Sequence, residues 1–274
     1  MSTNTIYPSK MNILFPKNYP DYVYNFAYGS NMEPNVLTGR RKIQPIESIP
    51  GVLEGWQLTF DLRGIPGIEP CFGNIRENSE CEIHGVLHKM TNIQFKHLLE
   101  TEGGSGVDPD GYIPMKFNVC AYDGRIIEAY ALVVQQNSPA IVKHFILPSS
   151  RYIGLLKSGA KYHQIHPTYI QYLESLPSIE RNIPITILVI IEILGITLFS
   201  APIWIPVVFY YICTQQKAQA RAFTFKMIVK NLWRIHKCLN RTDSNKSYSI
   251  IDFPLKSTDF KQHFQTFQNH QSKI

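Results

Sequence analysis

The chain has 274 residues, of which 44% are hydrophobic and 18% are charged. This composition excludes a wholly disordered chain, and the length allows one domain of ordinary size with additional segments. The formal net charge is +6. Residues 214–242 alone carry seven Lys and Arg side chains and no acidic residue, which leaves −1 for the rest of the chain. The basic character therefore belongs to one segment.

The cysteines give no sign of a disulfide scaffold or a metal site. There are five, an odd number, without a CxxC pair and without zinc-ligand spacing to the nine histidines. We expect reduced thiols, no metal and no cofactor. The first 20 residues lack a basic region followed by an apolar run, so we expect a flexible lead-in and no signal peptide.

Five stretches have the alternation or the aromatic and β-branched content that is typical of strands. They are 22–28, 51–61, 81–90, 113–122 and 126–135. Helices are expected at 91–100, about 149–162 and about 166–177. Many strands and few helices, without regular alternation, predict an α+β domain over residues 21–180 around a small barrel or curled sheet.

The helix at 91–100 leads to a candidate acid/base. Thr91 and Gln94 have capping-box spacing and predict its start. Glu102 follows its end and precedes two glycines, where a partly buried carboxylate could act as a general acid/base. A solvated glutamate at a helix end is the simpler interpretation of this residue alone, and Glu100 on the same turn is a competing candidate.

A candidate anion-binding turn follows the first strand. Tyr28-Gly29-Ser30-Asn31 ends an aromatic strand in turn-forming residues, whose backbone N–H groups can form a concave nest for an anion or an oxyanion. An ordinary strand-to-loop turn explains this sequence equally well in isolation.

The order of several short motifs is more informative than any one of them. FAYGSNM at 26–32 is followed by GNI at 73–75, GVL at 85–87, ETEGG at 100–104, PSSRY at 148–152 and SGA at 158–160. This order, over residues 24 to about 177, resembles the γ-glutamylcyclotransferase family. The resemblance implies a small mixed β-barrel flanked by helices.

The resemblance also implies the site. Glu102 would be the catalytic residue. The substrate pocket would be lined by Asn25, Phe26, Ala27, Tyr28, Gly29, Ser30, Asn31, Tyr112 and Tyr152. Three features depart from the family pattern: the loop between Glu102 and Tyr112 is longer, His88 stands where an aromatic residue is typical, and Asn25 stands where tyrosine is frequent.

The activity implied by the resemblance is an intramolecular cyclisation of a small γ-glutamyl substrate. The α-amine of a γ-glutamyl group attacks its own γ-carbonyl, 5-oxoproline closes, and an amino acid or amine leaves. Glu102 would move the proton, and the 28–31 turn would hold the oxyanion. The alternative is an adaptor or scaffold that keeps this fold without turnover.

Residues 183–213 contain one charge, Glu192, and predict a membrane-inserted segment. Pro202 and Pro206 interrupt the run, so we expect a hydrophobic hairpin that enters one leaflet and returns. A single tilted span and a buried core helix are the alternatives. A hairpin leaves both flanks in the cytosol, as the free cysteines and the lack of a signal peptide suggest.

Residues 214–242 predict a basic amphipathic helix. Lys226, Lys230 and Arg234 follow one another at intervals of four, whereas Phe225 and Val229 belong to an apolar face. Such a helix suits an anionic lipid surface, so we expect lipid as the partner of residues 183–242 and a membrane-associated protein. A calmodulin-type target helix or nucleic-acid contact is the alternative, and we expect no nucleic acid. Residues 243–274 are expected to form a polar tail, and the oligomeric state stays open.

Overall fold

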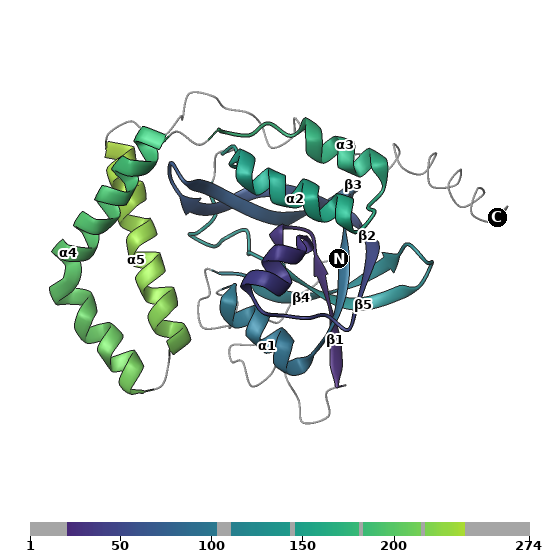
Figure 1. The fold of residues 1–274 in the computed structure, drawn as a ribbon, viewed down its shortest axis with the longest axis horizontal. Coiled ribbons are helices and arrows are strands. Elements are labelled where there is room, and N and C mark those ends of the chain that lie inside the picture. The colour runs from purple at the N-terminus through teal and green to yellow at the C-terminus, as the bar shows by residue number, and fades with distance from the viewer. Residues whose placement is uncertain (1–20, 103–110, 143–145, 181–182, 215–216, 239–274) are drawn as a thin grey trace.

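The computed structural model describes residues 21–102, 111–142, 146–180, 183–214 and 217–238. Five strands form one closed barrel, with helices around it (Figure 1). The strands are β1 Tyr22–Ala27, β2 Glu47–Ile65, β3 Glu69–Thr91, β4 Ile113–Ala121 and β5 Ile126–Val133. The α-helices are α1 Asn92–Thr101, α2 Ser150–Tyr162, α3 Pro167–Ser175, α4 Ile183–Cys213 and α5 Lys217–Cys238.

The barrel has the strand order β1-β3-β2-β4-β5. Neighbouring strands are antiparallel except β1 and β5, which run parallel where the barrel closes. Since closure removes both open edges, each strand can pair on two sides. The expected small mixed β-barrel flanked by helices is confirmed.

β2 and β3 are longer than the sequence predicted. They form one hairpin from the Glu47–Lys89 pair to the Ile65–Glu69 pair, with register shifts along it. Gly67 has a φ of 73° and makes the tight turn possible. The polar residues that interrupted the sequence pattern are inside paired strands, and Gly73 therefore belongs to β3 and not to a turn.

Three helices cover the barrel. Thr91 caps α1 with the expected capping box, in which the Gln94 N–H donates to Thr91 Oγ1 (3.2 Å) and the Thr91 N–H donates to Gln94 Oε1 (3.0 Å). Phe95, Leu98 and Leu99 of α1 are buried in one core cluster. α2 and α3 cover a larger cluster that includes the barrel interior. The predicted helices at 91–100, 149–162 and 166–177 are confirmed to within three residues.

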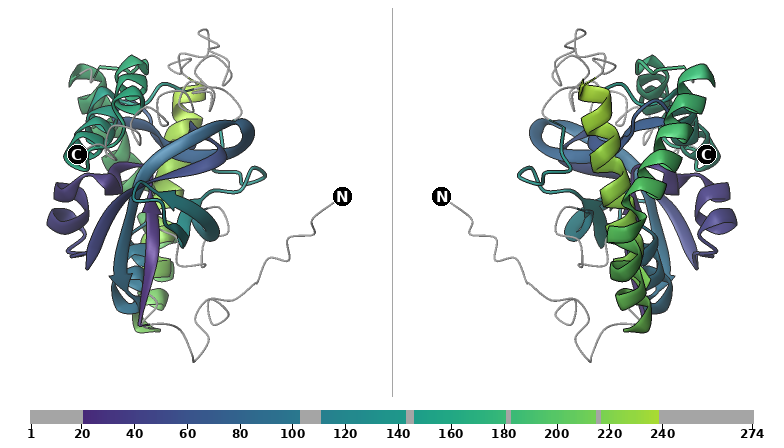
Figure 2. Two further views of the ribbon diagram at one scale, coloured as in Figure 1. Left: turned by 90° about the vertical axis from the view of Figure 1, so that its right-hand side faces the viewer. Right: turned by 90° about the vertical axis from the view of Figure 1, so that its left-hand side faces the viewer.

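The last two helices form a pair beside the barrel. α4 and α5 lie against each other, and α5 is the one nearer the barrel (Figures 1 and 2). α4 is a single helix that continues through Pro202 and Pro206. The hairpin predicted within 183–213 is therefore not present, because the chain reverses direction between α4 and α5 instead.

The membrane prediction requires a correction. In the part of the chain that the structure describes, no helix has both the length and the apolar character needed to cross a membrane. The predicted membrane-associated localisation is therefore wrong, and a lipid partner for residues 183–242 has no support. Part of the apolar surface has a protein partner instead, since Val189 of α4 and Val229 and Leu232 of α5 are buried. The predicted lead-in at 1–20, the tail at 243–274 and residues 239–242 of the predicted amphipathic helix lie outside the described residues.

Candidate active site

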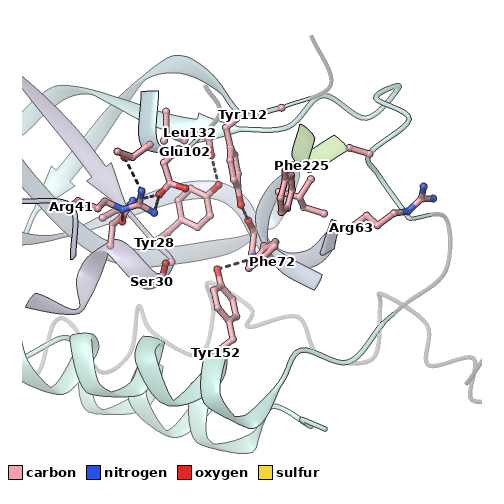
Figure 3. Close-up of a pocket in the computed structure, with 18 of the residues that line it drawn as sticks. Tyr28, Ser30, Arg41, Arg63, Phe72, Glu102, Tyr112, Leu132, Tyr152 and Phe225 are labelled. Carbon is pink, nitrogen blue, oxygen red and sulfur yellow. Dashed lines mark hydrogen bonds and ion pairs between the residues drawn. The ribbon is translucent and has the colours of Figure 1, made fainter. Parts of the chain in front are cut away.

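One cavity collects nearly all the functional groups that the sequence singled out. It has a volume of about 860 Å³ and lies at one end of the barrel (Figure 3). Its lining comes from β1 and the turn after it, from the β2–β3 hairpin, from the end of α1, and from α2 and α5. All nine predicted substrate-pocket residues and Glu102 line it. The structure thus brings together residues that are up to 127 positions apart, from Asn25 to Tyr152.

Glu102 is fixed by two partners from the segment after β1. The short helical turns η2 (Ser30–Met32) and η3 (Asn35–Arg40) bring Asn31 and Arg41 to the C-terminal end of α1. Asn31 Nδ2 donates to Glu102 Oε1 (2.7 Å), and an Arg41 guanidinium nitrogen lies 2.5 Å from the same oxygen. Because both contacts use Oε1, Glu102 Oε2 has no hydrogen-bond partner among the described residues.

Arg41 links the carboxylate to its surroundings. Its Nε donates to Asn31 Oδ1 (2.8 Å), and its other terminal nitrogen donates to Thr101 Oγ1 (2.8 Å). The side chains of Arg41 and Glu102 are only 13% and 16% exposed. An ion pair that is shielded from water to this extent orients its members far better than a surface pair does.

The 28–31 turn leads directly into η2. The Met32 N–H donates to Gly29 O (3.0 Å) and the Glu33 N–H donates to Ser30 O (3.1 Å). The N–H groups at the start of such a turn have no partner within it. This is the chemistry expected of a nest that accepts negative charge.

His88 supports this turn from beneath. Burial lowers the pKa of His88 to about 3, with a smaller contribution from His163 nearby, so its ring is neutral at physiological pH. A neutral ring can donate from Nε2 to Asn31 O (3.2 Å) while Nδ1 accepts from Ser48 Oγ (2.9 Å). The departure from the family pattern at His88 thus supplies a polar contact to the Asn31 backbone.

Three tyrosines form the polar wall opposite. Tyr28 donates to Leu132 O and Tyr112 donates to Gly73 O, while the Gly73 N–H donates to Tyr152 Oη (3.0 Å). Burial raises the pKa of all three tyrosines, so each stays a neutral hydroxyl. Gly73 has no side chain because a Cβ there would lie 3.0 Å from Tyr152 Oη.

Asn25 offers a further polar atom. Its side chain is 2% exposed, and its Oδ1 is buried without a hydrogen-bond partner among the described residues. A buried acceptor of this kind is costly unless a ligand completes it. We therefore regard Asn25 Oδ1 as a candidate contact for a donor on the substrate.

Sequence reasoning missed several residues of this cavity. Arg41 carries no signal in the sequence, because its pairing with residue 102 depends on a contact across 61 positions. Arg63 of β2 and four residues of α5, among them Phe225 and Lys230, also line the cavity. Within the described ranges, no group of three or more His, Cys, Asp or Glu side chains is arranged to hold a metal ion.

Comparison with known proteins places this site in a family. The chain is 28% identical over 178 residues to γ-glutamyl cyclotransferase gliK of Aspergillus fumigatus, covering 58% of this chain and 63% of that protein. It is 30% identical over 153 residues to γ-glutamyl cyclotransferase gliK of Claviceps purpurea, covering 53% of this chain and 66% of that protein. The chain belongs to the γ-glutamyl cyclotransferase family.

The match to these relatives is partial. The chain spans slightly less than two thirds of the length of these curated relatives. No protein-family model matches it. Among solved structures, the crystal structure of the uncharacterized human protein loc79017 has a TM-score of 0.50 and 19% sequence identity, over 62% of this chain and 99% of that one. This likeness shows that the barrel fold is shared.

Proposed function

We propose that this γ-glutamyl cyclotransferase family member converts a γ-glutamyl amino acid or amine into 5-oxoproline and the free amino acid or amine. The observation that carries the proposal is the 2.7 Å hydrogen bond between Asn31 and Glu102. It joins the family's anion-binding turn to its carboxylate inside one cavity. The names of the sequence relatives support the same reaction class.

Glu102 is the proposed general base and acid. The substrate α-amine is mostly protonated near neutral pH, with a pKa of about 7.7–8.0. Glu102 Oε2 takes one proton, and the amine nitrogen then attacks the γ-carbonyl carbon. The γ-amide bond breaks as Glu102 returns the proton to the leaving nitrogen. One C–N bond forms and one breaks, so neither water nor a redox partner is consumed.

The neighbouring groups supply orientation and charge stabilisation. Asn31 and Arg41 hold Oε1, which directs Oε2 to the substrate. The N–H groups of the 28–31 turn stabilise the tetrahedral oxyanion, a role in which one donor contributes about 10²–10³ in turnover. Asn25 Oδ1 accepts from the substrate amine, which places the nitrogen near its own γ-carbonyl.

The test is a product assay with the full chain. Purified protein is offered γ-glutamyl-alanine, glutathione and γ-glutamyl-lysine, and 5-oxoproline and the released partner are quantified together. We expect equal amounts of the two products from at least one substrate. Glu102→Gln should lower this activity by about 10²–10⁴-fold, the range of general acid/base catalysis. Glu100→Gln, which changes the competing carboxylate, should keep most of it.

Two results would contradict the proposal. No 5-oxoproline from any γ-glutamyl compound would favour an adaptor that keeps the fold without turnover. Near-normal activity in Glu102→Gln would leave the reaction in place but would remove Glu102 from its role.

A further inference from the structure

The α5 helix completes the cavity at the end away from Glu102. Phe225, Lys226, Val229 and Lys230 line it. These residues are spaced by one, three and one positions, so they occupy one face of the helix. Figure 3 shows Phe225 on the side of the cavity opposite Glu102, beyond Tyr112 and Phe72.

α5 is attached to the barrel where it meets the cavity. Trp233 Nε1 donates to Gly64 O (2.9 Å), and the Arg63 guanidinium carbon lies 5.3 Å from the centre of the Trp233 ring. On the helix itself, Val229 is 8% exposed and Leu232 is fully buried. These contacts hold the cavity-lining face of α5 at a defined position above the β2–β3 hairpin.

The groups at this end form an apolar and cationic surface. Phe225 is 50% exposed, although a phenylalanine side chain usually loses contact with water, and Phe72 lines the same cavity. Lys230 is exposed beside it. Arg63 Nε is buried and has no hydrogen-bond partner within the described part of the chain. An aromatic ring and unsatisfied cationic donors together suit a ligand with an apolar body and a carboxylate.

The cavity is larger than a γ-glutamyl group and a small amino acid require. Its volume of about 860 Å³ lies in the upper part of the range of about 300–1,000 Å³ that is usual for ligand pockets. Since the glutamyl group must lie beside Glu102 and the 28–31 turn, the α5 end remains for the part of the substrate that leaves.

We infer that α5 forms a leaving-group subsite, which favours γ-glutamyl conjugates whose leaving part has an aromatic or large apolar body and a free carboxylate. Phe225 packs against the apolar body, and Lys230 with Arg63 receives the carboxylate. This inference rests on the proposed cyclotransferase activity and names the substrate class of that same site.

The experiment compares three substrates that differ only in the leaving part: γ-glutamyl-phenylalanine, γ-glutamyl-alanine and γ-glutamyl-phenylalanine amide. The readout is kcat/KM for 5-oxoproline formation by the full chain. The ratio of phenylalanine to alanine substrate reports the apolar contact, and the ratio of acid to amide reports the cationic contact. For the wild type, we expect each ratio to exceed about 10, a typical value for one well-filled apolar pocket or one satisfied polar contact.

Four variants assign these ratios to α5. Phe225→Ala should lower the phenylalanine-to-alanine ratio about tenfold, and Lys230→Gln should lower the acid-to-amide ratio about three- to tenfold. The controls are Phe209→Ala on α4 and Arg234→Gln on α5, which change exposed residues that do not line the cavity. Both controls should keep the wild-type ratios. Thermal unfolding of each variant establishes that it is folded.

Binding measurements separate failure of the subsite from failure of the proposed activity. Titration calorimetry of the three compounds with Glu102→Gln, alone and combined with Phe225→Ala, reports preference without turnover. Unchanged kcat/KM ratios in Phe225→Ala and Lys230→Gln would overturn the subsite while leaving the cyclotransferase intact. If no compound is turned over, a tenfold weaker binding of γ-glutamyl-phenylalanine in the double variant supports the subsite, and equal binding of all three compounds overturns it.

Discussion

The two ends of the cavity are built in different ways. At the Glu102 end, polar groups are tied to one another: Asn31 and Arg41 hold Glu102, and Tyr152 contacts the Gly73 backbone. At the α5 end, Phe225 is half exposed and Lys230 is exposed. One end is organised before the substrate arrives, whereas the other presents side chains that a ligand has yet to contact.

This difference separates chemistry from selection. A proton-transfer site needs fixed geometry, because small displacements of a reacting group have large effects on rate. A leaving-group site needs shape and charge but tolerates adjustment. The chain thus places the Glu102 site on the barrel and α1, and the proposed selective surface on a helix outside the barrel. Variants at each end should therefore change different quantities.

Arg41→Met should have the largest effect among the changes considered next. It removes the ion pair to Glu102 and the contacts to Asn31 and Thr101. We expect kcat for 5-oxoproline formation to fall by about 10²-fold, because the carboxylate loses its orientation. The matched control is Arg40→Met, which changes a neighbouring cation that lines the cavity without contacting Glu102. An equal fall in both variants would show that Arg41 contributes only positive charge.

Two glycines of α2 give a matched pair for stability. A Cβ at Gly159 would lie 2.6 Å from the backbone carbon of Met32, whereas a Cβ at Gly154 would have nothing within 4 Å. Gly159→Ala should therefore reduce the free energy of unfolding by about 1–3 kcal/mol through overpacking. Gly154→Ala should increase it by about 0.5–1 kcal/mol, because alanine loses less backbone entropy in a helix. Urea unfolding of both variants measures this, and equal effects would mean that α2 does not press against η2.

The pH dependence of stability should identify His88. Burial lowers its pKa from 6.5 to about 3. Between these values the unfolded chain binds the proton and the folded chain does not, so stability is fully present above pH 6.5 and is lost as the pH falls. The slope from this one group is up to about 1.4 kcal/mol per pH unit. His88→Gln should flatten the fall in unfolding free energy between pH 6 and pH 4, whereas His97→Gln on the exposed side of α1 should not. A similar slope in His88→Gln and wild type would contradict the buried neutral ring.

Trp233→Phe should have the smallest effect and should act on the α5 end. It removes the hydrogen bond to Gly64 O while keeping an aromatic ring near Arg63. A net loss of about 1 kcal/mol of unfolding free energy is expected for one such bond. The phenylalanine-to-alanine substrate ratio should fall with it, because the cavity-lining face of α5 is held less firmly. Tyr162→Phe, an exposed aromatic on α2, is the control. A change in Glu102-dependent kcat without a change in the ratio would contradict the separation of the two ends.

The sequence predicted the barrel well because its strands and helices carry local signals. The capping box at Thr91 and the aromatic alternation of residues 22–28 are read within a few positions. The order of short motifs pointed to Glu102 and the 28–31 turn, which the structure places in hydrogen-bond contact. The roles of these residues remain proposals.

The remainder depended on contacts that no local pattern contains. Arg41 reaches Glu102 only because η3 and the end of α1 meet in space. The apolar run at 183–213 favoured a membrane segment, since a sequence does not show that α5 covers part of it. Phe225 and Lys230 were assigned to opposite faces of an amphipathic helix, yet both line the cavity, because residues five positions apart are still close on a helix.

The most direct test of the central claim is the split between binding and turnover in Glu102→Gln. Calorimetric titration with γ-glutamyl-alanine and the rate of 5-oxoproline release are measured on the same preparation. If Glu102 moves the proton, the dissociation constant should stay within about one order of magnitude while turnover falls by at least about 10²-fold. If turnover is retained, or if it is lost only in proportion to weaker binding, Glu102 is not the acid/base of this site.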